Sequence, residues 1–513
     1  MTSTSPSPVS TGRPGPGTFD SLDPATGEVT GTYPVHDADA VDAAVARARA
    51  AVGFWSPLPF ADRGRRLVTW AAVLTRRMSQ LAELVHAETG KPHSDAQLEI
   101  VMAVEHITWA ARHAARVLGP RRAPAGLLMA NFAASVEYQP LGVVGVIGPW
   151  NYPVFTPVGS IAYALAAGNA VVFKPSEYTP GVGAWLVDTF AQVVPEQPVL
   201  QLVTGFGATG EALCRAGVDK IAFTGSAATG KQVMRACADG LVPVIIEGGG
   251  KDALLVDADA DIPAAADAAV WGGMFNAGQS CIGTERVYVH AQAYDAFLAE
   301  VSTRLAGLRA GPGQKIGPMT TPGQPGVVRA HIAAALARGA TALAGGPDAA
   351  GERYVQPTVL LDVPEDCPAV TEETFGPTLT IAKVPDMDEA VRRANASSYG
   401  LGAAVFSRAH GTALARRLRA GLVAVNSVTL ALAGMPSLPW GGTGQSGFGR
   451  IHGPDGLREF TTAKAIARQR FTVPLRLTTF TRSDRTDKTV ATLTTLRHGR
   501  ASTLPPRSHR RST

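Results

Sequence analysis

Cysteine is scarce in this chain of 513 residues, and its few positions lie far apart. None forms a C-x-x-C pair, and no cluster has the close spacing that a zinc site, a redox motif or a disulfide framework shows. The sequence therefore predicts no metal centre and a protein of a reducing, cytoplasmic compartment. The four cysteines are Cys214, Cys237, Cys281 and Cys367.

Long hydrophobic runs are absent as well. The two longest, Gly142–Trp150 and Ile161–Phe173, are interrupted by Gly, Pro or Asn before they reach the ~18 residues that a membrane-spanning helix needs. Residues 1–18 are rich in Ser, Thr, Pro and Gly and lack the apolar stretch of a signal peptide. We expect a disordered leader there and no membrane partner.

Most of the chain also lacks an excess of positive charge, although its net charge is +5. Residues 464–513 carry twelve Lys and Arg against two Asp and Glu, which leaves 35 basic and 40 acidic residues before position 464. No aromatic residue follows Phe480, so the basic end has no groups that could stack on bases. We interpret residues 481–513 as a basic, disordered tail and expect no nucleic-acid partner.

The chain is rich in short β-branched runs that alternate with helical patterns from Leu141 onward. Such alternation is typical of α/β proteins with a parallel sheet and helices on both faces. Together with a mostly helical N-terminal region, it predicts a Rossmann-like cofactor domain from residues 19–117 and 141–249. The five strands are expected at Val143–Ile147, Ala170–Phe173, Val199–Val203, Ile221–Phe223 and Val242–Ile246.

A second alternating region covers residues 250–463 and predicts a second α/β domain. It contains Cys281 within the stretch Asn276–Gly283, which is too polar and too rich in glycine for a segment that only packs in the core. A lone cysteine is more often a small buried hydrophobe than a nucleophile, so both interpretations stay open on these flanks alone.

Ligands of parallel α/β sheets bind outside the carboxyl ends of the strands, and polar residues follow several predicted strands. Gly205, Gly207 and Gly210 match G-x-G-x-x-G, but this match follows the third strand and is weak in a chain with 55 glycines. The segment Gly225–Gly230 is a better phosphate candidate, because a helix begins at Ser226 and offers free N–H groups. Ser226 could equally be an ordinary N-cap.

The charged residues at the ends of two predicted strands also have two interpretations each. Lys174 and Glu177 could bind the hydroxyls of a sugar or form a surface ion pair. Glu247 is followed by three glycines that permit close approach to a ligand, or it could be a solvated loop carboxylate.

Eight motifs, in order and with familiar spacing, resemble the NAD(P)-dependent aldehyde dehydrogenase superfamily from about Phe19 to Ala465. Glu247 and Cys281 are 34 positions apart, as in that family. The motifs are Gly148-Pro-Trp-Asn-Tyr-Pro153, Lys174-Pro-Ser-Glu177, Phe223-Thr-Gly-Ser226, Glu247-Gly-Gly-Gly-Lys251, Gly278-Gln-Ser-Cys281 with Arg286, Glu372-Glu-Thr-Phe-Gly-Pro377, Tyr399-Gly-Leu401, and Pro439-Trp-Gly-Gly442 with Ser446-Gly-Phe-Gly-Arg450.

The resemblance implies roles for three catalytic residues. Cys281 would be the nucleophile that attacks the aldehyde carbonyl. The Asn151 side-chain amide and the Cys281 backbone N–H would hold the oxyanion, and Glu247 would activate the water that hydrolyses the thioester. Residues 250–463 would then be the catalytic domain.

The resemblance also implies a dinucleotide site and an oligomer. NAD is expected to be preferred over NADP, because the Glu177 carboxylate would repel a 2′-phosphate. Homodimers or homotetramers would form through residues 118–140 and 464–480, with extended segments at Ala123–Tyr138 and Phe471–Phe480. The implied cofactor residues are Trp150, Lys174, Glu177, Gly225, Ser226, Gly230, Glu373 and Phe375.

Two positions depart from the family pattern. Gly248 stands where the family usually has Leu beside the base, and Thr443 or Gly444 stands where it commonly has Lys. Neither change removes a reacting group.

The substrate is expected to be an uncharged aliphatic or aromatic aldehyde. Tyr152 and Phe275 would line its tunnel, together with the apolar segment Thr429–Met435. Phe275 stands six positions before Cys281, where relatives that oxidise succinate semialdehyde commonly carry Arg. A succinate-semialdehyde dehydrogenase, acyl transfer to coenzyme A and a non-enzymatic descendant of the family are the alternatives.

Overall fold

The computed structural model describes residues 17–473 and 477–499. The chain divides into two compact units, Met1–Gly119 with Tyr138–Thr462, and Pro120–Glu137 with Ala463–Thr513. The predicted leader up to residue 16 and the end of the predicted tail, residues 500–513, lie outside the described residues.

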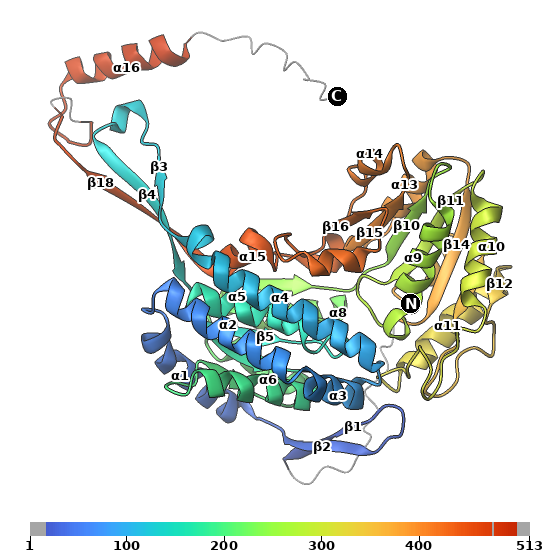
Figure 1. Cartoon of the computed structure of the whole chain (residues 1–513). Helices are drawn as coiled ribbons and strands as arrows, with labels where there is room; N and C mark the ends of the chain where they lie inside the picture. Colours follow the sequence, from blue (N-terminus) through green and yellow to red (C-terminus); the bar gives the residue numbers. More distant parts are fainter. Residues whose placement is uncertain (1–16, 474–476, 500–513) are drawn as a thin grey trace. The chain divides into compact units, whose positions relative to one another are not determined.

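The first unit contains a six-stranded sheet with the order β17-β9-β8-β5-β6-β7 (Figure 1). Its five long strands are parallel, and β17 (Gly447–Phe448) is antiparallel at one edge. All five strands expected in this region are confirmed, and their apolar side chains are buried. They are β5 (Val143–Ile147), β6 (Ala170–Lys174), β7 (Leu200–Leu202), β8 (Lys220–Thr224) and β9 (Val244–Glu247).

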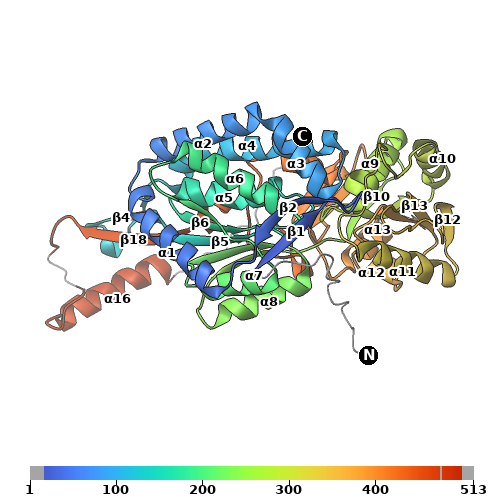
Figure 2. The same ribbon diagram turned by 90° about the horizontal axis from the view of Figure 1, so that it is seen from below.

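Helices cover both faces of this sheet (Figure 2). On one face lie α5 and α6, with the long N-terminal helices packed behind them; α1, α7 and α8 lie on the other. The helices are α1 (Ala38–Trp55), α2 (Phe60–Arg76), α3 (Met78–Thr89), α4 (His93–Leu118), α5 (Phe155–Ala167), α6 (Pro180–Val193), α7 (Gly207–Arg215) and α8 (Ala227–Ala238).

The strand order contains a topological switch point between β5 and β8. From β5 the chain adds β6 and β7 on one side and then returns to add β8 and β9 on the other. Ligands of such sheets bind in the crevice at this point. The Gly205 motif follows the edge strand β7 and not a strand of the switch point, whereas Gly225 and Ser226 follow β8 and border the crevice.

A seven-stranded sheet with the order β12-β13-β14-β11-β10-β15-β16 forms the second half of the same unit. Helices α9 (Ile262–Met274) and α10 (Tyr294–Leu305) pack on one face, and α13 (Met387–Asn395) and α14 (Gly411–Ala415) on the other. All strands but β12 are parallel. They are β10 (Asp252–Val256), β11 (Thr284–His290), β12 (Thr341–Ala344), β13 (Thr358–Leu361), β14 (Thr378–Val384), β15 (Gly402–Phe406) and β16 (Leu422–Val425).

The second unit is built on a three-stranded antiparallel sheet. Its strands are β3 (Arg121–Ala123), β4 (Phe132–Pro140) and β18 (Thr461–Gln469). The expected late strand at Phe471–Phe480 is wrong: β18 ends at Gln469, and the described residues of 471–480 form no strand.

The C-terminal region also differs from the expected disordered tail, because Asp484–His498 forms helix α16. Ser483 caps this helix by accepting a bond from the Thr486 N–H. Acidic residues in the first turn and basic residues in the last turn complement the helix dipole. Net charge alone did not reveal this local pattern.

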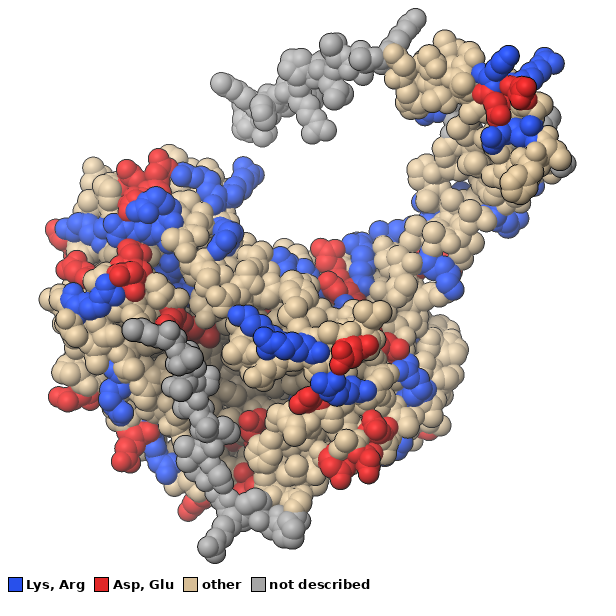
Figure 3. Space-filling view, turned by 180° about the vertical axis from the view of Figure 1, so that it is seen from behind, with Lys and Arg blue, Asp and Glu red and all other residues tan. Residues whose placement is uncertain are grey.

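The surface bears charges of both signs. On the face shown in Figure 3, Lys and Arg are interspersed with Asp and Glu over the first unit. Within the part of the chain that the structure describes, every helix is too short or too polar to cross a bilayer.

Candidate active site

Asn151 and Cys281 lie in loops from different halves of the first unit, and hydrogen bonds tie these loops together. Asn151 follows β5, and its Nδ2 donates to the Gln279 carbonyl oxygen, two residues before Cys281, at 3.1 Å. In return, Asn276 Nδ2 donates to the Asn151 carbonyl oxygen at 3.2 Å. The structure thus brings the predicted nucleophile loop and oxyanion residue together.

A buried ion pair that sequence reasoning missed supports the Asn151 turn. Lys91 Nζ lies 2.6 Å from Glu99 Oε2, with both side chains at most 1% exposed. Lys91 also donates to the Asn151 carbonyl oxygen at 2.7 Å, and Glu99 Oε1 accepts from the Val154 N–H at 2.7 Å. The only sequence signal was a pair of charged residues at positions that the surrounding helices bury.

Glu247 ends β9 and is 4% exposed. Trp440 Nε1 donates to its Oε1 at 2.7 Å, and Thr224 Oγ1 donates to its Oε2 at 3.3 Å. Burial raises the pKa of Glu247 to about 7, although both hydrogen bonds act to lower it. A carboxylate with this pKa exchanges protons near neutral pH, as a general base must.

Cys281 is partly exposed, and its thiol is strongly biased toward the protonated form. Desolvation raises its pKa well above the ordinary value, and the negative charges of Glu247, Glu373 and Asp252 raise it further. A proton must therefore leave before the sulfur can attack. Glu247 and Glu373 are nearby carboxyl groups whose pKa values burial raises to about 7 and about 8, so either can accept a proton near neutral pH.

The structure explains why position 248 holds a glycine. Its N–H donates to the Ser446 carbonyl oxygen at 3.0 Å, and a Cβ at this position would lie 2.6 Å from the Gln445 carbonyl oxygen. The backbone of the 443–447 loop thus fills the space that the family's usual Leu would need. In that loop, Gly444 has φ +63° and no room for a Cβ beside the Ser398 carbonyl oxygen.

The crevice at the switch point fits the phosphates of a dinucleotide. Ser226 caps α8, and its Oγ accepts from the Thr229 N–H, so other amides of the first turn remain without an intrahelical partner. Gly225 precedes the cap. A Cβ added at Gly230 would lie 3.0 Å from Ile246 Cγ2. The helix dipole and these amides favour a negatively charged ligand.

Lys174 and Glu177 lie beside each other at the end of β6. Lys174 is almost buried and donates to the Pro175 carbonyl oxygen at 3.0 Å, and its Nζ is 4.0 Å from Glu177 Oε2. That distance is longer than a hydrogen bond, and the Glu177 side chain is 36% exposed. Both groups can therefore still bond to ribose hydroxyls.

Glu373, Phe375 and Trp150 gather on one side of the site. The Trp150 and Phe375 rings meet edge-on at 5.5 Å, and Glu373 Oε1 accepts from the Gly250 N–H at 2.9 Å. Glu285, which sequence reasoning missed, accepts from the N–H groups of Thr374 and Phe375 and thereby holds this loop. Phe375 has a positive φ of 52°, a strained conformation that this anchoring maintains.

Aromatic rings lie along the other side of the site. Phe275 stacks on Tyr152 at 6.5 Å and on Trp271 at 4.4 Å. Lys91 Nζ lies 4.4 Å from the centre of the Tyr152 ring, but Glu99 already pairs with it. Tyr152 is only 3% exposed and donates to Ser280 Oγ at 3.3 Å, next to Cys281.

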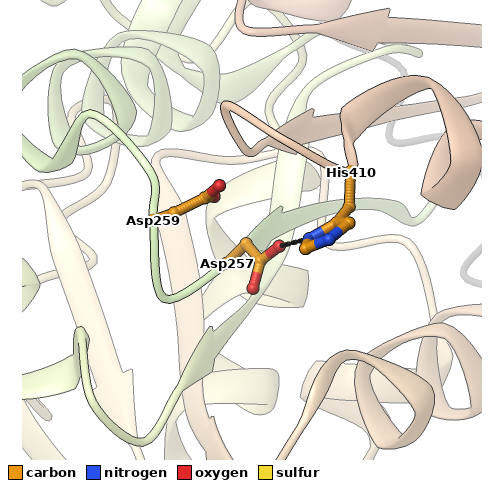
Figure 4. Close-up of side chains that lie close together, drawn as sticks. All are labelled: Asp257, Asp259 and His410. Carbon is orange, nitrogen blue, oxygen red and sulfur yellow. Dashed lines mark hydrogen bonds and ion pairs between the residues drawn. The ribbon is translucent and has the colours of Figure 1, made fainter.

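One group of potential metal ligands occurs in the described residues, away from these side chains. Asp257, Asp259 and His410 face one another at the end of β10 (Figure 4). The Ser407 hydroxyl and the backbone N–H groups of Arg408 and Ala409 already donate to the two carboxylates. The arrangement ties the loop after β15 to the end of β10.

Comparisons with known proteins agree with this geometry. The model of the aldehyde dehydrogenase family matches residues 12–466. The chain is 38% identical over 450 residues to the 4,4'-diapolycopene aldehyde oxidase of Methylomonas sp, covering 86% of this chain and 84% of that protein. It is 36% identical to a putative succinate-semialdehyde dehydrogenase [NADP(+)] of Mycobacterium ulcerans, covering 87% of each chain.

Solved structures share the fold at similar identity. The NAD-dependent aldehyde dehydrogenase from Sinorhizobium meliloti superposes with a TM-score of 0.85 at 34% identity, covering 90% of this chain and 93% of that one.

Proposed function

The chain belongs to the aldehyde dehydrogenase family, and from this premise we propose how its residues oxidise an aldehyde to a carboxylic acid with NAD or NADP. One observation carries the assignment: Asn151 is hydrogen-bonded into the loop of Cys281, and the buried base Glu247 lies close enough for its charge to affect the thiol. An acyl-transfer reaction needs a nucleophile, an oxyanion donor and a base in one site.

The first half of the reaction forms a thioester on Cys281. Glu247 takes the thiol proton, and the sulfur attacks the carbonyl carbon to form a thiohemiacetal. The Asn151 amide and the Cys281 N–H stabilise the oxyanion, and one such donor contributes ~3–4 kcal/mol to the rate. The bound dinucleotide supplies the acceptor for the hydride that leaves this carbon.

The second half releases the acid. Glu247 first releases the thiol proton to solvent, and its carboxylate then removes a proton from a water molecule that attacks the thioester carbon. The C–S bond breaks, and the thiolate leaves. The buried position of Glu247 makes it more basic than an exposed carboxylate, which suits it to this step.

We assign the cofactor to the crevice at the switch point. The amides of the α8 first turn, with Gly225, Ser226 and Gly230, would hold the pyrophosphate, and Lys174 and Glu177 the adenosine ribose. Glu373 and Phe375 would contact the nicotinamide ribose and ring, with Trp150 beside them. We expect NAD to be preferred, because the Glu177 carboxylate repels a 2′-phosphate.

For the substrate we favour uncharged aliphatic or aromatic aldehydes. Tyr152 and Phe275 are stacked near Cys281, and the adjacent Lys91 is neutralised by Glu99. Asp95 accepts a bond from the Asn276 N–H, next to Phe275, so a carboxylate already lies on this side. A substrate carboxylate would be desolvated there without a cationic partner.

Succinate semialdehyde is the second candidate, because a relative that is 36% identical carries that substrate in its name. Comparing kcat/KM for succinate semialdehyde, hexanal and benzaldehyde distinguishes the two. A value at least tenfold higher for succinate semialdehyde would overturn the preference for uncharged substrates.

We further propose a cytoplasmic homodimer or homotetramer. The four unpaired cysteines favour a reducing compartment. The strands β3 and β18 lie at the two edges of the sheet of the second unit, and an edge strand can pair with a second copy of the chain.

The function is tested by mixing the protein with an aldehyde panel and NAD, with and without coenzyme A, and measuring NADH and the acid product. We expect steady NADH formation and a free acid without coenzyme A. A strict requirement for coenzyme A, or no NADH with any aldehyde, would contradict the proposal.

A further inference from the structure

Trp440 donates the shortest hydrogen bond to the Glu247 carboxylate, and its motif alone assigns it no role. Its indole Nε1 lies 2.7 Å from Glu247 Oε1, and the residues are 3% and 4% exposed. The other side-chain donor, Thr224, is at 3.3 Å. An indole N–H can only donate, so it favours an acceptor with full negative charge.

The position of the indole is fixed from two sides. Trp440 and Ile451 exchange two backbone hydrogen bonds of 2.7 and 2.8 Å. The ring packs edge-on against Phe155 at 6.0 Å and lies 5.8 Å from the His452 ring. Both flanks restrict rotation of the indole away from Glu247.

The chain between Trp440 and Ile451 is also attached to the strand of the base. Gly447 in β17 pairs with Glu247 in β9, and Phe448 pairs with Ile246. Ser446 Oγ donates to the Gly249 carbonyl oxygen at 2.6 Å. The indole and the carboxylate therefore belong to one clamped structure, so their hydrogen bond costs little additional ordering.

We propose that Trp440 is a positioning residue, whose indole N–H holds the Glu247 carboxylate in one orientation and stabilises its ionised form for removal of a proton from water. The proposal rests on the role of Glu247 as the base. The bond opposes the effect of burial on the pKa of Glu247, which is about 7 with the bond in place.

Trp440→Phe tests this directly, because it keeps an aromatic ring and removes the N–H. We expect kcat at pH 7 to fall about tenfold, in the range for loss of a hydrogen bond to a charged group. The acid limb of the kcat profile should move about one pH unit higher, since the carboxylate loses a stabilising donor. The KM for NAD should change less than twofold, and the pre-steady-state burst of NADH should remain.

Trp70→Phe is a matched control. Trp70 is fully buried, and its Nε1 donates to Thr189 Oγ1 at 3.2 Å, away from Glu247. Trp70→Phe should lose about as much stability as Trp440→Phe but keep the wild-type pH profile of kcat. In a Glu247→Gln background, Trp440→Phe should change the residual rate less than twofold.

A measurement on the unmodified chain keeps the proposal testable if Trp440→Phe does not fold. One of the seven indole N–H signals in a nitrogen-15 NMR spectrum should titrate with a midpoint near pH 7. That titration should disappear in Glu247→Gln.

Two results would overturn the role of Trp440: an unchanged acid limb in Trp440→Phe, or no indole signal that follows Glu247. A wild-type protein without aldehyde-dependent NADH would instead contradict the proposed function, and the NMR titration would still report on the hydrogen bond.

Discussion

Glu247 and Cys281 are both desolvated, and the charge of Glu247 disfavours the thiolate of Cys281. Burial raises the pKa of both groups, and the charge of Glu247 raises that of the thiol. At neutral pH the resting pair therefore carries less negative charge than a fully ionised carboxylate and thiolate would. Transfer of a proton from Cys281 to Glu247 keeps the net charge constant while it creates the nucleophile.

The pKa of Glu247 predicts the pH dependence of turnover. Only the carboxylate removes a proton from water, so a deacylation-limited kcat should fall about tenfold per pH unit below pH 7 and level off above it. Steady-state rates between pH 5 and 9 measure this. An acid limb near pH 4.5, the value of an ordinary carboxyl group, would contradict it.

The same pKa affects stability. Because the folded pKa lies above the unfolded value, the folded state holds the proton more tightly, and its stability falls as the pH rises from about 4.5 to 7. Glu247→Gln removes this loss, so its Tm relative to wild type should rise between pH 5 and pH 8. A pH-independent difference in Tm would exclude the effect.

Glu177 should decide the choice of cofactor. Glu177→Gln removes the repulsion of a 2′-phosphate while it keeps a polar side chain of similar size. We expect the ratio of kcat/KM for NAD to that for NADP to fall at least fivefold. An unchanged ratio would mean that Glu177 does not reach the adenosine ribose.

The roles of single residues could be predicted from the sequence only where the residues belong to a motif. Cys281, Glu247 and Asn151 belong to motifs, and their strand-end positions are visible in the alternation of the chain. Lys91, Glu99 and Glu285 act through contacts between segments far apart in sequence. Their roles therefore needed the tertiary structure.

At the scale of elements, the segment Trp440–Ile451 closes on β9 and leaves no space for a side chain at Gly248. Gly248→Ala would place a Cβ 2.6 Å from the Gln445 carbonyl oxygen, so the loop or the base must move. We expect kcat to fall about 10- to 100-fold, as misplaced catalytic groups cause. Gly53→Ala, in α1 with no atom within 4 Å of the added Cβ, is the control and should keep full activity.

The Lys91–Glu99 pair couples α4 to the Asn151 turn. Glu99→Gln leaves a buried ammonium without its counter-charge, which should lower the free energy of unfolding by about 3–5 kcal/mol. Glu83→Gln removes the exposed partner of His93 and should change the free energy of unfolding by less than about 1 kcal/mol. Chemical denaturation of both variants compares them, and equal effects would contradict the role of burial.

The buried parallel strands were predictable, and the exposed N-terminal hairpin was not. Continuous apolar runs indicate β5 to β9, because both faces of that sheet are covered. The hairpin β1 (Thr18–Leu22) and β2 (Val29–Pro34) was missed within a region expected to be helical, since its exposed strand carries little apolar alternation. Helix α16 was missed for a related reason: none of its residues is buried.

At the scale of the whole molecule, the two sheets of the first unit supply different parts of one reaction. The six-stranded sheet carries Asn151, Glu247 and the candidate cofactor residues up to Gly230, while the loops of the second sheet carry Cys281, Glu373 and Phe375. The α/β class and the family were predictable from the sequence. The aldehyde was not, because the residues around Cys281 come from segments that are far apart in the sequence.

The central claim is that Cys281 forms a thioester that Glu247 helps to hydrolyse. Rapid mixing of an aldehyde and NAD with wild type, Cys281→Ala and Glu247→Gln, followed by NADH absorbance, tests it most directly. The account predicts steady turnover for wild type and none for Cys281→Ala. For Glu247→Gln it predicts a burst of at most one NADH per site that forms more slowly than in wild type, because water must then accept the thiol proton. Turnover by Cys281→Ala at a near wild-type rate would contradict it.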